Sequence, residues 1–271
     1  MSLTNIGQQI TIYVGTCLFL IGLIGNLTNI FVFLTVRQYR KTACTFYFLI
    51  SSISNLIYLS VNLPTRILST GFSYDSTRTS NVWCKCRQFG IFTFPLITLT
   101  CSCLSTIDQY FATSQNVRLR RLSQIKLAYK IVCCVILIYC LHGIPIILLY
   151  NISPVSSTCT QTNAYFSRYS IFYLLGLITT IPSSIMILFG YLTYRNLHQT
   201  RVLLQQQADR QLIRMILYII CLDLFCLIPY GIQMAYNTIT TGWSKDANQL
   251  AIERFSFTIL TTVTYAYYSV R

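Results

Sequence analysis

The apolar residues of this chain gather into long runs, and short polar or basic stretches separate the runs. A helix needs about 20 apolar residues to cross the roughly 30 Å hydrocarbon core of a bilayer. Most of the runs reach that length, and the last one, before Arg271, is barely long enough. The pattern predicts an all-α membrane protein: a bundle of seven transmembrane helices in a single domain, 1–271. The predicted spans are 10–36, 45–64, 88–110, 126–150, 169–194, 213–236 and 253–270.

The third run is distinguished by the residues that flank it. It follows Trp83 and Cys84, and it ends at Asp108, Gln109 and Tyr110. A helix from Cys84 to Asp108 would span roughly 36 Å at about 1.5 Å rise per residue, slightly more than the hydrocarbon core. The run therefore predicts one helix with a cysteine at one membrane face and a polar cluster at the other.

The composition supports a lipid environment. Apolar residues make up 54% of the chain and charged residues 10%, against about 25% charged residues in an average soluble protein. The net charge of +14 would suit nucleic acid, but the basic residues fall in the gaps between apolar runs, so no nucleic-acid partner is expected. His142 and His198 lie near opposite membrane faces without a nucleophile, and the cysteine pairs lack zinc spacing. We therefore expect neither an enzyme nor a metal-binding protein.

The distribution of charge predicts the orientation. The N-terminal residues before the first run carry no charged side chain, whereas Arg37, Arg40 and Lys41 follow it. Because cytoplasmic loops are rich in lysine and arginine, the N-terminus is expected outside and the first loop inside. The other gaps agree, with more basic residues on the predicted inner side. We therefore expect a multi-pass protein of the plasma membrane with an extracellular N-terminus.

Three cysteines, Cys84, Cys86 and Cys159, lie in polar gaps that could face an oxidising compartment. The others lie in apolar runs or beside the first basic cluster, and a free thiol inside an apolar run behaves as a small hydrophobe. The residues alone leave open which of the three form a disulfide. Asn151 begins an Asn-Ile-Ser sequence that fits N-glycosylation on the outer side, weakened by the following Pro154.

Polar and proline residues also lie inside the predicted spans. A carboxylate in mid-membrane costs roughly 2.5–3.5 kcal/mol on insertion scales, so Asp223 is expected to face the bundle interior. Pro182 and Pro229 should bend their helices and open an outward cavity between spans three, five, six and seven. The aromatic residues of this region would equally suit a lipid-facing belt. The candidates for the wall of a ligand pocket are Gln88, Phe92, Tyr173, Tyr230, Gln233, Met234, Glu253 and Phe255.

The order and spacing of these residues resemble the rhodopsin-like family of G-protein-coupled receptors over nearly the whole chain. In finer detail, the sequence around Ile181, Arg195 and Asp209-Arg210-Gln211 resembles invertebrate neuropeptide receptors. The residues that carry the family resemblance are Gly25-Asn26, Cys84, Cys159, Asp108-Gln109-Tyr110, the helix-bending prolines Pro145, Pro182 and Pro229, and Cys226-Leu227-Ile228-Pro229.

The resemblance implies a receptor that couples an extracellular ligand to a heterotrimeric G protein. It implies a disulfide between Cys84 and Cys159. It also implies a switch facing the G protein, formed by Asp108, Gln109 and Tyr110. No acid lies in the outer half of span three, where amine-binding relatives carry one, so a peptide or apolar ligand is expected, with a peptide preferred.

The polar core that the resemblance implies has changed in this chain. The family's second-helix aspartate is Asn55 here. We expect Asp223 on span six to replace it and to form a core polar site with Asn26 and Asn55. Asp223 could be protonated there or hold a sodium ion, and no other cofactor is expected. A protonated Asp223 bonded to backbone is the simpler alternative.

Further departures from the family bear on signalling. The family's central arginine is Gln109, so Asp108 is expected to find a cation from the inner loops and to hold the resting state less firmly. The sixth-helix tryptophan is Leu227, and the Asn-Pro-x-x-Tyr sequence of helix seven is absent before Arg271, which suggests a truncated seventh helix. A receptor-like protein that binds ligand without signalling is therefore a second hypothesis. A transporter or channel is a third hypothesis, although such proteins usually carry more charged residues inside the membrane than Asp223 alone.

Overall fold

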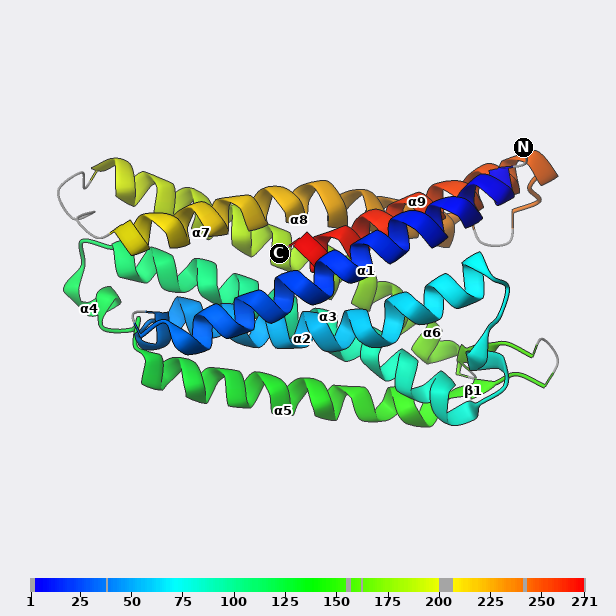
Figure 1. The fold of residues 1–271 in the computed structure, drawn as a ribbon, viewed down its shortest axis with the longest axis horizontal. Coiled ribbons are helices and arrows are strands. Elements are labelled where there is room, and N and C mark those ends of the chain that lie inside the picture. The colour runs from blue at the N-terminus through cyan, green and yellow to red at the C-terminus, as the bar shows by residue number, and fades with distance from the viewer. Residues whose placement is uncertain are drawn as a thin grey trace.

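The described chain folds into seven long helical rods that lie side by side along one axis (Figure 1). The computed structural model describes residues 3–37, 39–154, 157–161, 163–199, 207–240 and 243–270. One rod is a composite of three consecutive helical segments. The rods are α1 (Leu3–Thr35), α2 (Ala43–Arg66), α3 (Asn81–Thr113), α5 (Ile125–Leu149), the composite of α6 (Ala164–Phe172), η4 (Tyr173–Thr180) and α7 (Ile181–Gln199), α8 (Gln207–Ile239), and α9 (Ala247–Val270).

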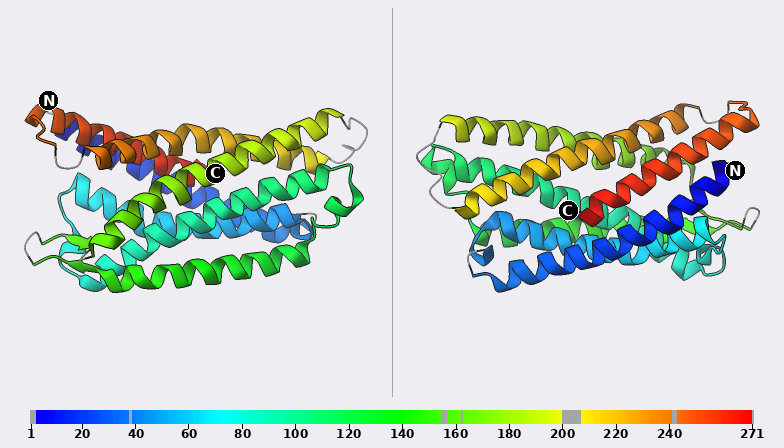
Figure 2. Two further views of the ribbon diagram at one scale, coloured as in Figure 1. Left: turned by 180° about the vertical axis from the view of Figure 1, so that it is seen from behind. Right: turned by 45° about the horizontal axis from the view of Figure 1, so that its top comes forward.

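Short elements join the rods at the two ends of the bundle (Figures 1 and 2). The end that holds the start of α1 and a β-hairpin is called the hairpin end, and the opposite end is called the α4 end. The hairpin pairs its strands antiparallel, with Asn151 opposite Thr160. The hydrophobic pattern did not predict these strands because each has only 3 residues. The short elements are η1 (Tyr39–Lys41), η2 (Ile67–Gly71), η3 (Ser76–Arg78), α4 (Val117–Arg120), β1 (Tyr150–Ile152) and β2 (Cys159–Gln161).

The central rod is α3, which packs against α2, α5 and α7. In its most apolar stretch of 18 residues, 72% of the residues are buried. The rod begins where Ser80 Oγ accepts a hydrogen bond from the Trp83 backbone N–H at 3.3 Å. This bond satisfies one of the donors that the start of a helix leaves without partners. Ser102 and Thr106 donate their hydroxyl hydrogens to carbonyls four residues earlier. These polar side chains can therefore lie in an apolar interior without an unpaired donor.

The outer surface of the bundle is apolar. In both α1 and α5, only 17% of the residues in the most apolar 18-residue stretch are buried. Large side chains such as Ile24, Phe31 and Leu148 are about two-thirds exposed. Apolar surface of this extent is stable only against lipid. Among the described residues, six helices are long and apolar enough to cross a membrane, and together they include every rod except α9.

The seventh rod, α9, lies beside α1 and α8 (Figure 2). It is less apolar than the others because Gln249, Glu253 and Arg254 lie in its first turns. Gly22 of α1 marks a close approach to α9, because a Cβ added there would lie 3.2 Å from the Ser269 Cα. A small residue at this contact lets the two backbones approach, as is common between helices in membranes.

Every rod except α5 extends beyond its predicted range at the hairpin end, and two of these extensions have a clear local cause. The first, α1, begins at Leu3 rather than at residue 10, and its additional turns pack against α9 through Gly7. The second, α2, continues past Pro64 into η2 instead of ending there. Proline removes one backbone donor, but the N–H of Ile67 bonds the carbonyls of Leu63 and Pro64 and the helix goes on as a wider turn. A single domain over residues 1–271 stays a prediction.

Candidate functional site

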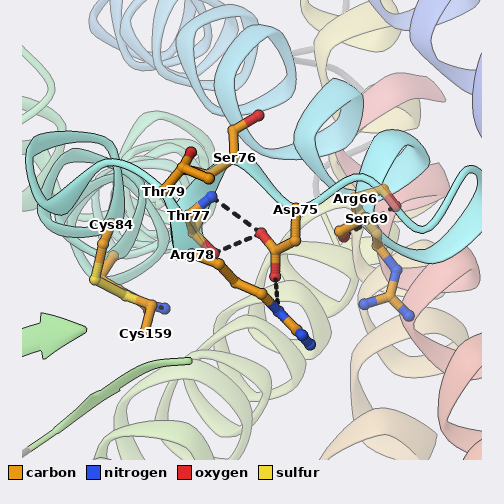
Figure 3. A network of polar contacts seen from close by, with 10 residues as sticks. Arg66, Ser69, Asp75, Ser76, Thr77, Arg78, Thr79, Cys84 and Cys159 are labelled. Atoms are coloured by element: carbon orange, nitrogen blue, oxygen red, sulfur yellow. Dashed lines mark hydrogen bonds and ion pairs between the residues drawn. A yellow bond between two sulfur atoms is a disulfide. The ribbon is translucent and has the colours of Figure 1, made fainter. Parts of the chain in front are cut away.

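A disulfide joins Cys84 of α3 to Cys159 of β2 and ties the hairpin to the central rod (Figure 3). The two Cα atoms are 5.7 Å apart, and the pairing that the family resemblance implied is confirmed. Cys86, the competing cysteine, is free and exposed. Cross-linking residues 75 positions apart is nominally worth about 4 kcal/mol, and less here because helices already restrain both ends. Gln88, a predicted pocket residue, donates from Nε2 to Cys159 Sγ at 3.9 Å.

A polar network around Asp75 holds the segment that leads into α3 (Figure 3). The Asp75 carboxylate accepts hydrogen bonds from the Thr77 N–H at 3.0 Å, the Thr77 hydroxyl at 2.6 Å and Arg78 Nε at 3.3 Å. Burial raises the pKa of Asp75, but the hydrogen bonds from Thr77, the charge of Arg87 and the hydrogen bond from Arg78 outweigh it and hold the pKa below its ordinary value. The sequence reasoning missed this network, although an aspartate that bonds the backbone two residues on is a common turn signal.

Aromatic side chains fill the space beneath the hairpin. The ring centroid of Phe92 lies 4.5 Å from that of Tyr173, and Phe92 also contacts Tyr150 and Phe166. The Tyr173 hydroxyl donates to the Phe92 backbone carbonyl at 2.9 Å. Phe92 and Tyr173, predicted to line a ligand pocket, are buried in this packing and are not among the lining residues of the three pockets described below, so their role in a pocket stays a prediction. An aromatic residue near a membrane face suits either role, so the sequence could not separate them.

Among the described residues, three pockets can be placed beside α9 at the hairpin end. The first, of about 630 Å³, lies between α8 and α9 and includes Gln233 and Glu253. The second, of about 480 Å³, includes Met234 and Glu253. The third, of about 300 Å³, lies among α1, α2 and α9 and includes Phe255. These predicted pocket residues are thus divided among three neighbouring pockets.

The second and third pockets share a wall formed by Arg254 and Phe257 of α9. Tyr230 of α8, another predicted pocket residue, packs against Phe257 with 6.2 Å between the ring centroids. Arg66 of α2 approaches the same ring, and its guanidinium carbon lies 5.8 Å from the ring centroid. Residues of three helices therefore meet at this wall.

An ion pair closes the connection between α8 and α9. Lys245 Nζ lies 2.6 Å from Glu253 Oε2 and also donates to the Thr240 hydroxyl at 2.7 Å. The Tyr236 hydroxyl donates to Glu253 Oε1 at 2.9 Å. Glu253, predicted at the rim of the pocket, lines the first and second pockets. Its negative charge is already matched by Lys245.

Asn26 and Asn55, two of the predicted core polar residues, each join a pair of helices. Asn26 Nδ2 donates to the Tyr268 backbone carbonyl at 3.2 Å and so connects α1 to α9. Asn55 Oδ1 accepts a hydrogen bond from the Thr98 hydroxyl at 2.7 Å and so connects α2 to α3. Both side chains are about 1% exposed. They act as buried interhelical contacts.

Asp223, the third predicted core residue, is fully buried in α8 and accepts a hydrogen bond from the Ser183 hydroxyl of α7 at 2.7 Å. A side chain of another helix therefore bonds this carboxylate. The hydrogen bonds of Asp223 and Asn55 join different pairs of helices. A shared core polar site, with or without a sodium ion, and a protonated Asp223 bonded to backbone both stay predictions, and no step below depends on sodium.

Asp108 and Gln109 are buried at the α4 end of α3, next to the partly buried Tyr110. The Asp108 carboxylate lies near the Ser123 side chain and the backbone N–H of Cys44, two groups that favour its charged form. Cys44 lies in the first turn of α2, where N–H groups lack partners within the helix and the dipole favours an anion. Asp108 forms no ion pair within the described part of the chain, and a cation from the inner loops stays a prediction.

The three predicted helix-bending prolines occupy different positions. Pro145 and Pro229 lie inside α5 and α8. Pro182 is the second residue of α7, directly after the π-helical η4. In η4 the hydroxyls of Thr179 and Thr180 donate to carbonyls five residues earlier, at 2.9 and 2.6 Å. A wide helical segment thus precedes a proline that has no N–H to continue the ladder.

Some other predicted positions can also be placed. Asn151 lies in β1, where its Oδ1 accepts a hydrogen bond from Asn81 Nδ2 at 3.3 Å; its glycosylation stays a prediction. His142 bonds the Tyr169 hydroxyl. The side chains of His198 and of residues 209–211 lie outside the described residues.

Three features define the class of protein as the rhodopsin-like receptors. They are the order of the helices, the disulfide between the central rod and the hairpin, and the polar cluster at the other end of that rod. The family described as 7 transmembrane receptor (rhodopsin family) matches residues 25–269. The chain therefore belongs to this family and is a multi-pass membrane receptor rather than an enzyme.

One relative is similar over most of the chain. It is the N-arachidonyl glycine receptor of Macaca fascicularis, which is 23% identical over 240 residues. The matched region covers 84% of this chain and 70% of that receptor.

Proposed function

We propose that this protein is a plasma-membrane receptor that transmits the signal of an extracellular peptide to a heterotrimeric G protein, with its N-terminus outside the cell. The observation that carries the proposal is the course of α3. This rod runs from the disulfide at the hairpin end, near the pockets, to the buried Asp108 at the α4 end. Membership of the rhodopsin family supports the same reading.

Two features favour a peptide as the ligand. The first half of α3, from Asn81 to Ile97, contains no acid that could bind an amine. The sequence around Ile181 and Arg195 resembles invertebrate neuropeptide receptors. The name of the macaque relative points to a fatty-acyl amide as a second candidate, an apolar ligand that would also suit pockets lined partly by aromatic residues.

The mechanism we infer is a shift between two helix arrangements. A ligand that contacts the hairpin ends of α8 and α9 favours one arrangement only if it binds that arrangement more tightly. At the α4 end, Asp108 of α3 lies near the backbone N–H of Cys44 in the first turn of α2. A movement that separates the two would uncover backbone N–H groups of α2 and alter the surface presented to a G protein.

The proposal is tested with the purified full chain in nanodiscs of neutral lipid. We expect a member of a library of short synthetic peptides to accelerate nucleotide exchange on a heterotrimeric G protein. The Cys84→Ser variant, which lacks the tether between α3 and the hairpin, should respond less than the Cys86→Ser control. Peptides that bind without accelerating exchange on any G-protein class would contradict the signalling part.

That outcome would favour the second candidate, a receptor-like protein that binds ligand without signalling. The observation behind it is Gln109, which is buried and uncharged where the family carries an arginine. An amide can donate hydrogen bonds, but it cannot form the charged pair with the neighbouring Asp108 that an arginine would form.

A further inference from the structure

We propose that the third pocket binds a carboxylate group of the ligand through Arg66 of α2 and Arg254 of α9. This inference rests on the proposed function in one respect, namely that the ligand reaches the hairpin end from outside. The pocket has a volume of about 300 Å³, and both arginines line it together with Gln8 of α1 and Thr70 of η2. A space of this size suits the end group of a larger ligand.

The charge of the pocket lining is unbalanced. Two guanidinium groups line the pocket, and none of the residues that line it is acidic. The acids nearby are already paired: Asp75 bonds Arg78, and Glu253 bonds Lys245. Arg66 takes no part in the Asp75 network, although it lies close to it in the view of Figure 3. An anionic ligand would therefore supply the charge that the protein does not.

The Arg66 side chain is the stronger indication. Its Nε is buried and has no hydrogen-bond partner within the described structure. An unsatisfied buried donor is costly, more so when it carries charge. The guanidinium plane presents N–H groups in a fork that matches the two oxygens of a carboxylate. The Phe257 ring, 5.8 Å from the guanidinium carbon, helps to hold the fork in place.

The rest of the lining indicates what carries the carboxylate. Leu3, Phe255 and Phe257 provide apolar surface next to the two arginines. A carboxylate attached directly to an apolar group would use both parts of the pocket. Two sources share this chemistry, the free C-terminus of a peptide that ends in an apolar residue and the head group of a fatty-acyl amino acid.

The test measures binding and does not depend on signalling. The purified full chain in zwitterionic nanodiscs is titrated with two matched probe pairs, and its thermal unfolding is recorded. One pair is a set of hexapeptides ending in phenylalanine, with a free carboxylate or a C-terminal amide. The other is N-oleoyl glycine and its primary amide. We expect the free acid of at least one pair to bind about 10-fold to 100-fold more tightly than its amide, as for a charge-assisted hydrogen bond.

Substitutions test whether the preference for the free acid arises in the third pocket. Arg66→Gln and Arg254→Gln should each remove most of the preference for the acid, and Arg66→Lys should retain part of it. Arg78→Gln makes the same change of charge at the same end of the bundle, outside the pocket, and should leave the preference unchanged. Arg254 is exposed, so Arg254→Gln is expected to fold even if Arg66→Gln does not.

The outcomes separate clearly. A preference for the peptide acid or for the lipid acid supports the proposal and identifies the source. Equal binding of acid and amide in both pairs, no binding of either acid, or an acid preference that survives Arg66→Gln or Arg254→Gln overturns it. A receptor that binds the acid but fails to activate a G protein contradicts the proposed function and leaves the carboxylate site standing.

Discussion

Asp223 and Ser183 form a polar pair inside a bundle whose outer surface faces lipid. The carboxylate is fully buried and accepts the serine hydroxyl at 2.7 Å. In such surroundings a polar group that loses its partner cannot turn to water instead. The pair should therefore stabilise the contact between α8 and α7 more than an exposed pair would.

We expect Asp223→Ala to lower the free energy of unfolding by about 1–3 kcal/mol, because it leaves the Ser183 hydroxyl without its acceptor. Asp223→Asn keeps an acceptor oxygen and should cost less. Thermal unfolding of the purified protein in detergent, with Asp223→Ala, Ser183→Ala and the double variant, measures the coupling. Effects of the two single variants that add to within about 0.3–0.5 kcal/mol would show that the pair contributes no coupling.

At the residue scale, sequence reasoning succeeded where chemistry restricts the choice. Only three cysteines lay in polar gaps, and the family resemblance then selected Cys84 and Cys159. It did not predict the burial of Phe92 and Tyr173, which pack on each other while Tyr150 and Phe166 pack on Phe92. Their place in a ligand pocket stays a prediction. Sequence reasoning also missed Arg66, because a pocket between α1, α2 and α9 joins residues far apart in the chain.

The contact between α1 and α9 shows how single small residues set the spacing of whole elements. A Cβ added at Gly22 would lie 2.6 Å from Leu59 Cδ1 and 3.2 Å from the Ser269 Cα, whereas one added at Gly25 would lie 3.5 Å from the Ser269 carbonyl oxygen. The distance of 3.5 Å at Gly25 is an ordinary van der Waals contact, whereas the two distances at Gly22 are too short for a Cβ atom unless the neighbours move. The two glycines therefore form a matched pair on one helix.

We expect Gly22→Ala to destabilise the protein and Gly25→Ala to be neutral or slightly stabilising. Both changes improve helix propensity by about 0.5–1 kcal/mol, but only the first forces α9 away from α1. Thermal unfolding of the two purified variants gives the comparison. Equal shifts in the two variants would mean that α9 does not approach α1 as closely as the structure places it.

At the element scale, the long helices were predictable because apolar runs of their length have few other stable forms in lipid. Their ends were not, since α1 and α2 continue through polar residues that pack against other helices. The strands of the hairpin are too short for their alternation to be recognised, and the disulfide and the α3 contacts hold them.

At the scale of the whole molecule, the two ends of the bundle differ in their charge. Basic residues gather near η1 and α4, among them Arg40, Lys41, Arg118 and Arg120. At the hairpin end, Asp75 and Glu253 offset two of the basic residues, Arg78 and Lys245, while Arg66 and Arg254 have no acidic partner among the described residues. An excess of basic residues in the loops is characteristic of the cytoplasmic side of membrane proteins.

We therefore expect the hairpin end to lie outside the cell. An epitope tag at the N-terminus should bind antibody on intact cells, and a tag inserted after Gln115 should bind only after the membrane is permeabilised. Labelling of both tags in permeabilised cells is the control for expression. Labelling of the Gln115 tag on intact cells would reverse the orientation and place the pockets in the cytoplasm.

The π-helical η4 has a consequence for the phase of the composite rod. A π turn contains more residues than an α turn, so η4 changes the angle at which α7 presents its side chains relative to α6. With this offset, Tyr173 at the top of η4 reaches the Phe92 carbonyl while Ser183 below it reaches Asp223. A strictly α-helical segment of the same sequence would rotate one of these two side chains away from its partner. The composite rod can therefore bond both α3 and α8 only because it combines π-helical and α-helical turns.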